Sequence, residues 1–99
     1  MIRFTFDNVE YGLQFRHTTA TAGELGLPGI DPDEDRRVTY ATVLDAKTMA
    51  PEFQGVSVCH PYDPFIKDEG RRRALEDALT YGKLLKPFRT AVWNAYFSR

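Results

Sequence analysis

The stretch IRFTFDNVEYGLQF (residues 2–15) decides the fold, because apolar and polar side chains alternate on both sides of a short turn. Residues 2–6 and residues 9–15 each place an apolar side chain at every second position, which is typical of half-buried strands. Asp7 and Asn8 lie between the two runs, and both residue types tolerate the left-handed backbone of tight turns. The sequence therefore predicts a β-hairpin that closes near Asp7-Asn8.

Two further strands follow in the middle of the chain. Residues 37–44 are rich in β-branched side chains, which favour extended backbone. A turn at residues 45–53 precedes a second apolar alternation at residues 54–59. We expect these runs to form a second hairpin and to complete a four-stranded antiparallel sheet.

The C-terminal third changes to helical periodicity. Asp68 and the pair Asp63-Pro64 are alternative N-terminal caps for a helix that ends at Tyr81, with Gly82 just past its last turn. Pro87 can open a short second helix. Its apolar stripe comprises Phe88, Ala91, Val92, Ala95 and Tyr96. The predicted fold class is α+β: a four-stranded antiparallel sheet of two hairpins, packed with one main helix and a short C-terminal helix.

Between the predicted hairpins, residues 17–36 show no periodicity. Glycines and prolines interrupt this segment, and an acidic run ends it. We expect a long acidic loop within a single domain that spans residues 1–99, and loops of this length are often functional.

Composition excludes several classes of protein. The chain is 42% hydrophobic and 27% charged, which is typical of a globular protein. Its single cysteine, Cys59, rules out an intrachain disulfide, so a cytoplasmic protein is expected. No apolar run approaches the roughly 20 residues that span a membrane.

The net charge of −1 hides a gradient along the chain. Residues 1–35 hold seven acidic residues against two basic ones, whereas residues 67–99 hold eight basic residues against four acidic ones. Such asymmetry bears on the choice of partners and not on the fold. It suggests two separate candidate surfaces.

The first candidate surface binds a protein partner. It combines the acidic run with two aromatic residues that flank the stripe of the terminal helix, and aromatic residues dominate interface energetics. The residues are Asp31, Asp33, Glu34, Asp35, Trp93 and Phe97. The spacing Asp31-x-Asp33-x-Asp35 also begins like a calcium loop, but Arg36 stands where such loops need glycine, so no metal is expected.

The second candidate surface is basic and would bind nucleic acid. Its residues are Lys67, Arg71, Arg72, Arg73, Lys83, Lys86 and Arg89. Successive helical residues point about 100° apart, so three consecutive arginines cannot share one face. Opposite charges at i,i+4 also favour pairing within the helix, and four such pairs are predicted: Asp68–Arg72, Glu69–Arg73, Arg72–Glu76 and Arg73–Asp77. A solvated, self-paired face is the simpler interpretation of this cluster.

Cys59 and His60 are the only other pair that suggests chemistry. Adjacent strand residues face opposite sides, so they do not form a simple catalytic dyad, and His17 is the only other histidine available for a zinc site. We interpret Cys59 as a small buried apolar residue. We therefore expect a protein that is not an enzyme and that needs no cofactor.

One pattern extends over much of the chain: Gly55-x-Ser57-x-Cys59-His60-Pro61-x-Asp63-x-Phe65-x-Lys67-x-x-Gly70-Arg71-x-x-Ala74-Leu75, followed by Arg89-x-Ala91-x-Trp93-x-x-Tyr96. With the opening hairpin, it resembles a group of small uncharacterised proteins of tailed bacteriophages. The resemblance implies a phage accessory gene and assigns no functional residues. The strands and the helix that opens at Lys67 are also similar to the strand–strand–helix half of a double-stranded-RNA-binding domain, although Asp68 and Glu69 interrupt its basic cluster.

Together these observations predict a small, non-catalytic phage accessory protein in the cytoplasm of a bacterial host. We expect it to bind a host protein or protein complex and to inhibit a defence system, as anti-CRISPR and anti-restriction proteins do. The alternative is a nucleic-acid-binding protein that uses the basic helix. A homodimer formed through an exposed sheet edge or the Trp93 helix is left open. No membrane partner is expected.

Overall fold

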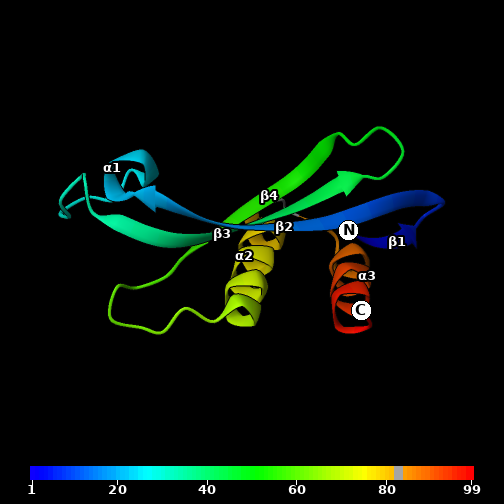
Figure 1. Cartoon of the computed structure of the whole chain (residues 1–99). Coiled ribbons are helices and arrows are strands. Elements are labelled where there is room, and N and C mark those ends of the chain that lie inside the picture. The colour runs from blue at the N-terminus through cyan, green and yellow to red at the C-terminus, as the bar shows by residue number, and fades with distance from the viewer. Residues whose placement is uncertain (82–83) are drawn as a thin grey trace.

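A computed structural model describes residues 1–81 and 84–99. Its elements are β1 (Ile2–Phe6), β2 (Val9–Thr21), α1 (Ala22–Leu25), β3 (Asp35–Asp45), β4 (Pro51–Val58), α2 (Lys67–Tyr81) and α3 (Lys86–Phe97). The four strands form one antiparallel sheet in the order β1-β2-β3-β4. Figure 1 shows α2 and α3 side by side on one face of this sheet. The predicted α+β fold is confirmed.

The first hairpin closes as the sequence predicts. Phe6 pairs with Val9, and the two residues between them, Asp7 and Asn8, have φ angles of 52° and 67°. Positive φ at both central residues is the geometry that matches the twist of paired strands. The helix expected at residues 68–81 begins one residue earlier, at Lys67. Gly82, expected just past its last turn, lies outside the described residues.

The prediction of a loop over residues 17–36 is largely wrong. β2 continues to Thr21, and β3 begins at Asp35, so that Thr21 pairs with Asp35. Thr21 then caps the short α1, because its Oγ1 accepts a hydrogen bond from the Glu24 amide at 3.2 Å. The irregular acidic connection is thus confined to residues 26–34. The far part of β2, residues 17–21, is rich in threonine and carries polar side chains on both faces of the strand. Its sequence therefore shows no apolar alternation that would predict a strand.

α2 lies directly on the backbone of β4. A Cβ built on Gly55 would overlap the Ala74 carbonyl oxygen and the Ala78 amide nitrogen. The helix presents only small residues here, since Ala74 and Ala78 are both buried. Asp77 of the same helix accepts a hydrogen bond at 2.9 Å from the Val56 amide of β4.

α3 packs through the predicted stripe, of which Phe88, Val92 and Tyr96 are buried. The ring centroid of Phe88 lies 5.1–6.1 Å from four rings of the sheet, those of Phe4, Phe6, Tyr11 and Phe53. Such tilted and edge-on pairs are favourable arrangements for aromatic rings. Among residues 1–81 and 84–99, no helix has the length and apolar character needed to span a membrane.

Replacing Gly55 by alanine is expected to destabilise the fold. The added methyl group would overlap helix backbone that cannot rotate away, and such overpacking costs about 1–3 kcal/mol. Urea unfolding would measure the free energy of unfolding of Gly55→Ala beside Gln54→Ala, a neighbouring exposed position expected to change it by less than about 0.5 kcal/mol. Equal stability of the two variants would contradict the close contact of α2 and β4.

Candidate partner-binding surface

A groove runs between α2 and α3 on the helical side of the molecule. It consists of two hollows of about 440 and 390 Å³ that share Glu76 and Trp93. We call it the α2–α3 groove. Its walls are formed by Glu69, Arg72, Arg73, Glu76, Leu79 and Thr80 of α2 and by Lys86, Arg89, Thr90, Trp93 and Phe97 of α3. These residues recur at helical spacing, so each helix contributes one continuous stripe.

The aromatic residues predicted to bind a partner lie together in this groove. Burial of Phe88, Val92 and Tyr96 against the sheet turns Trp93 and Phe97 to the side of α3. Their rings stack with centroids 5.6 Å apart and an interplanar angle of 20°. Phe97 is 64% exposed and Trp93 is half-buried. The groove therefore presents a flat aromatic surface.

Arginines face these rings from α2. Arg72 Nε lies 3.5 Å from Asp68 Oδ2, and Arg73 pairs with Glu69, so two of the four predicted i,i+4 pairs are confirmed. The pairs predicted for Arg72–Glu76 and Arg73–Asp77 do not form among the described residues. The arginine pairs fix the guanidinium groups on the wall of the groove without burying them. Asp77, which could also pair with Arg73, instead accepts the hydrogen bond from Val56.

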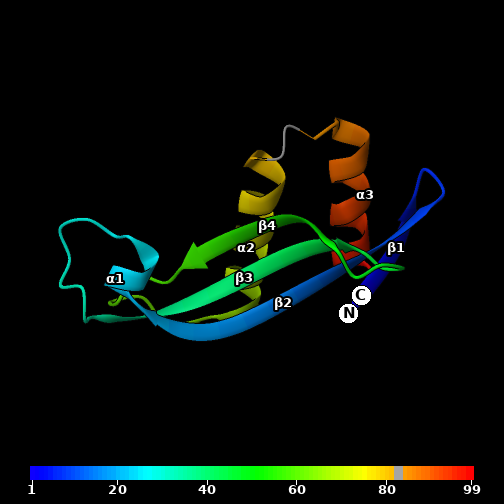
Figure 2. The same cartoon turned by 90° about the horizontal axis from the view of Figure 1, so that it is seen from above.

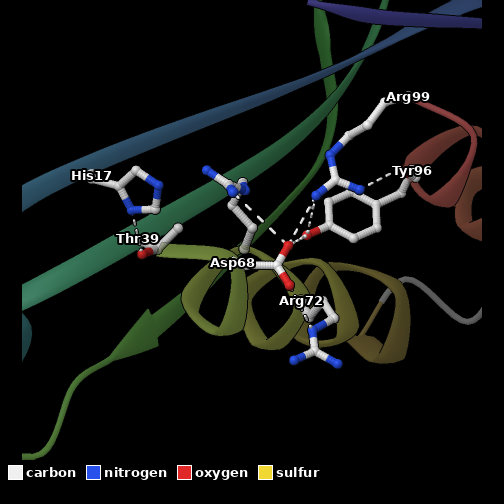
Figure 3. A network of polar contacts seen from close by, with 7 residues as sticks. His17, Thr39, Asp68, Arg72, Tyr96 and Arg99 are labelled. Atoms are coloured by element: carbon white, nitrogen blue, oxygen red, sulfur yellow. Dashed lines mark hydrogen bonds and ion pairs between the residues drawn. The ribbon is translucent and has the colours of Figure 1, made fainter. Parts of the chain in front are cut away.

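A polar network joins the two helices at one end of the groove (Figure 3). The buried Tyr96 hydroxyl donates to Asp68 Oδ1 at 2.7 Å, and Arg99 Nη2 donates to the same oxygen at 2.9 Å. The Arg99 guanidinium also lies over the Tyr96 ring, 3.9 Å from its centroid. This network fixes the C-terminal turn of α3 to the first turn of α2.

The network shifts the pKa of both partners. The hydrogen bond from Tyr96 is the largest influence on Asp68 and lowers its pKa. Burial raises this pKa, and the charges of Arg72, Arg99 and Arg71 lower it, so that the pKa is lowered overall. Burial and the hydrogen bond to Asp68 raise the pKa of Tyr96. Both shifts favour a charged carboxylate that accepts from a neutral phenol.

The other predicted residues do not gather at one site. The connection between α1 and β3, which carries the acidic run Asp31, Asp33, Glu34 and Asp35, lies at the end of the molecule opposite α3 (Figure 1), so the acidic run and the aromatic pair form separate surfaces. Asp31 organises the acidic turn by accepting hydrogen bonds from the Asp33 and Glu34 amides. Glu34 in turn pairs with Arg36.

The basic residues are also divided. Arg72, Arg73, Lys86 and Arg89 line the α2–α3 groove. Arg71 turns instead toward the sheet, where it lines a different hollow with Phe15 and His17. Lys67 is exposed at the first residue of α2. Lys83 lies outside the described residues.

Cys59 and His60 do not form a catalytic pair. The Cys59 thiol lies near the carbonyl oxygens of His60, Asp63 and Pro64 at 3.5–4.0 Å, and the His60 ring accepts from the Tyr62 amide. Cys59 is partly exposed rather than buried, because it follows the last residue of β4 and borders a hollow of about 310 Å³. In the described chain, no three acidic, histidine or cysteine side chains cluster as metal ligands.

His17 is the residue that sequence analysis misplaced most. It lies in β2 rather than in a loop, with Nδ1 2.8 Å from Thr39 Oγ1 and its ring against Phe65. Burial lowers its pKa, and the charges of Arg71, Lys67 and Arg37 lower it further, which favours a neutral imidazole. Its Nε2 is buried without a hydrogen-bond partner among the described residues. No local pattern marks this contact, because it joins three distant segments.

The Asp68 network predicts a specific dependence of stability on pH. Because the folded state lowers the pKa of Asp68, its stabilising effect is complete above the pKa of the unfolded state and is lost as pH falls through the folded pKa. Asp68→Asn is therefore expected to be less stable at pH 7 and to lose less further stability below about pH 4. Thermal unfolding between pH 7 and pH 2 measures both effects.

The matched control is Asp63→Asn, since the Asp63 side chain is exposed and has no ion pair in the part of the chain that the structure describes. If Asp68→Asn and the control lose the same stability on acidification, the network does not stabilise the fold.

No family model, curated protein or solved structure matches the chain. The feature that combines exposure, aromatic character and ordered charge is the α2–α3 groove.

Proposed function

We propose that the protein is a non-catalytic binding protein that docks on a host macromolecule through the α2–α3 groove. The observation that carries the proposal is the exposed Phe97 ring stacked on Trp93, with Arg72 and Arg73 on the opposite wall. Tryptophan and arginine are enriched among the residues that dominate binding energy. A protein partner is the first candidate.

The chemistry of the groove specifies the kind of partner. An apolar side chain would insert between the Trp93–Phe97 pair and α2, and carboxylates beside it would meet Arg72 and Arg73. Ion pairs with Asp68 and Glu69 hold these arginines in place before binding, which reduces the entropy lost on association. A protein segment that carries both apolar and acidic residues fits this surface.

Inhibition of a host defence system is the proposed biological role. Its support is the resemblance to tailed-bacteriophage proteins, together with the small size of the chain and the ordered binding groove. The partner would then be a component of an anti-phage complex, of the CRISPR or restriction type, in the cytoplasm of the bacterial host. Binding would inhibit by occupying a surface that the complex needs.

Truncating the exposed aromatic ring is expected to weaken the complex. Phe97→Ala removes a groove contact from a position that is mostly solvent-exposed in the free protein, so the fold is expected to remain intact. Loss of one central interface contact lowers affinity by about tenfold. Affinity purification of the tagged protein from nuclease-treated host lysate, followed by titration of the captured partner, measures this change.

Tyr62→Ala is the matched control, because Tyr62 is a larger exposed aromatic residue outside the groove. A partner that binds the wild type and both variants equally would place the interface elsewhere. Repeated purification without any partner would count against the proposal as a whole.

Nucleic acid is the second candidate ligand, because four basic residues line the same groove. Arg72 and Arg73 line one of its two hollows, and Lys86 and Arg89 line the other. Trp93 borders both hollows and offers a surface on which a base can stack. Binding through these residues would depend strongly on salt, since phosphate contacts release counterions.

Lys86→Gln combined with Arg89→Gln discriminates this candidate. If both side chains contact phosphates, the slope of log affinity against log salt falls by about two relative to wild type. Fluorescence anisotropy with labelled duplex between low and moderate salt measures the slope. Arg3→Gln, on β1 and paired with Glu10, is the control. Absence of binding at low salt would reject nucleic acid as the ligand.

A further inference from the structure

β2 is much longer than the strand beside it. β1 pairs with β2 from Val9 to Leu13, where Ile2 is the last partner. The rest of β2, as far as Thr21, pairs only with β3. In the described part of the chain, no strand lies on the other side of residues 14–21, and Figure 2 shows this side of β2 open. We call residues 15–21 the open edge.

The backbone of the open edge points outward at alternate residues. The two-residue turn makes Phe6–Val9 the hydrogen-bonded closing pair, so the odd-numbered residues of β2 direct their backbone groups away from β3. The even-numbered residues direct their backbone groups toward β3. Two hydrogen bonds on that side agree with this: the Glu10 carbonyl accepts from the Ala46 amide, and the Ala22 amide donates to the Glu34 carbonyl. The outward donors and acceptors of the open edge are those of Phe15, His17, Thr19 and Thr21.

This edge lacks the usual protection against pairing. Natural edge strands are blocked by proline, by bulges or by inward-pointing charges. Residues 14–21 contain no proline, and the β2–β3 register has no bulge over this span. Arg16 is the one residue of this span that carries a formal charge at pH 7, and its guanidinium lies over the Tyr40 ring.

We propose that two copies of this chain pair through their open edges as antiparallel strands, which extends the sheet across a two-fold axis at Thr18. In this register Phe15 pairs with Thr21 of the second copy, and His17 pairs with Thr19. A register shifted by one step toward β1 would place Thr21 opposite Leu13, which Ile2 already occupies. A shift the other way would leave Phe15 unpaired. Pairing at Thr18 therefore uses the whole open edge.

The symmetry of the open edge favours a second copy as the occupant. The edge is bounded by β1 at one end and by α1 at the other, so an identical edge pairs with its full length. At the axis itself Thr18 faces Thr18, so no like charges oppose each other there.

The dimer is independent of the proposed function. The α2–α3 groove lies on the helices and stays open when the sheet edges pair. Failure of either proposal therefore leaves the other intact.

Sedimentation equilibrium of the purified full chain is the first test. Wild type is expected to show twice the monomer mass of 11.3 kDa at micromolar concentration. Thr19→Pro removes one outward amide without touching the β2–β3 ladder, and we expect at least a tenfold weaker dimer. Thr19→Ala keeps the amide and is the matched control. A wild type that stays monomeric at all concentrations overturns the proposal.

A cross-link keeps the test decisive if Thr19→Pro does not fold. Across a non-hydrogen-bonded pair the Cα atoms lie about 4.5 Å apart, within the range that a disulfide spans. Thr18→Cys in a Cys59→Ala background is expected to form a covalent dimer under mild oxidation, whereas Gln54→Cys on β4 is not. The proposal would be wrong if the Thr19→Pro variant dimerised as tightly as the wild type and Thr18→Cys cross-linked no better than Gln54→Cys. The dimer would then use another surface.

Discussion

The contact between α2 and Gly55 is the constraint on which the rest of the structure depends. Because β4 has no side chain at this point, the helix lies against strand backbone, with Ala74 and Ala78 at the contact. This close approach fixes the height of α2 above the sheet. α3 lies farther along the sheet, where Phe88 packs against four aromatic rings, so two helices share one face through different kinds of contact.

The groove lies between the two helices. α2 rests on Gly55 through Ala74 and Ala78, α3 rests on aromatic rings through Phe88, and the side chains that face each other between them line two hollows. The contact of Tyr96 and Arg99 with Asp68 fixes the two helices at one end of it. The groove is thus formed by two helices rather than by a loop.

Local patterns predicted the regular elements, and contacts between distant residues escaped them. The hairpin at Asp7-Asn8, the α3 stripe and the Asp68–Arg72 pair all lie within short windows of sequence, where spacing determines geometry. Residues 17–21 were missed because a strand with polar side chains on both faces resembles a loop in composition. The Tyr96–Asp68 hydrogen bond joins residues 28 positions apart, and the groove exists only once both helices are placed on the sheet.

The hydrogen bond from the Val56 amide to Asp77 has a consequence for assembly. A sheet with two free edges can add neighbours on both sides without limit, which is the geometry of fibres. In this protein the carboxylate of Asp77 occupies an outward amide in the middle of β4, so that edge is a poor template for another chain. Strand addition on the β4 side is thereby disfavoured, which leaves pairing to the opposite side of the sheet, formed by β1 and the far part of β2.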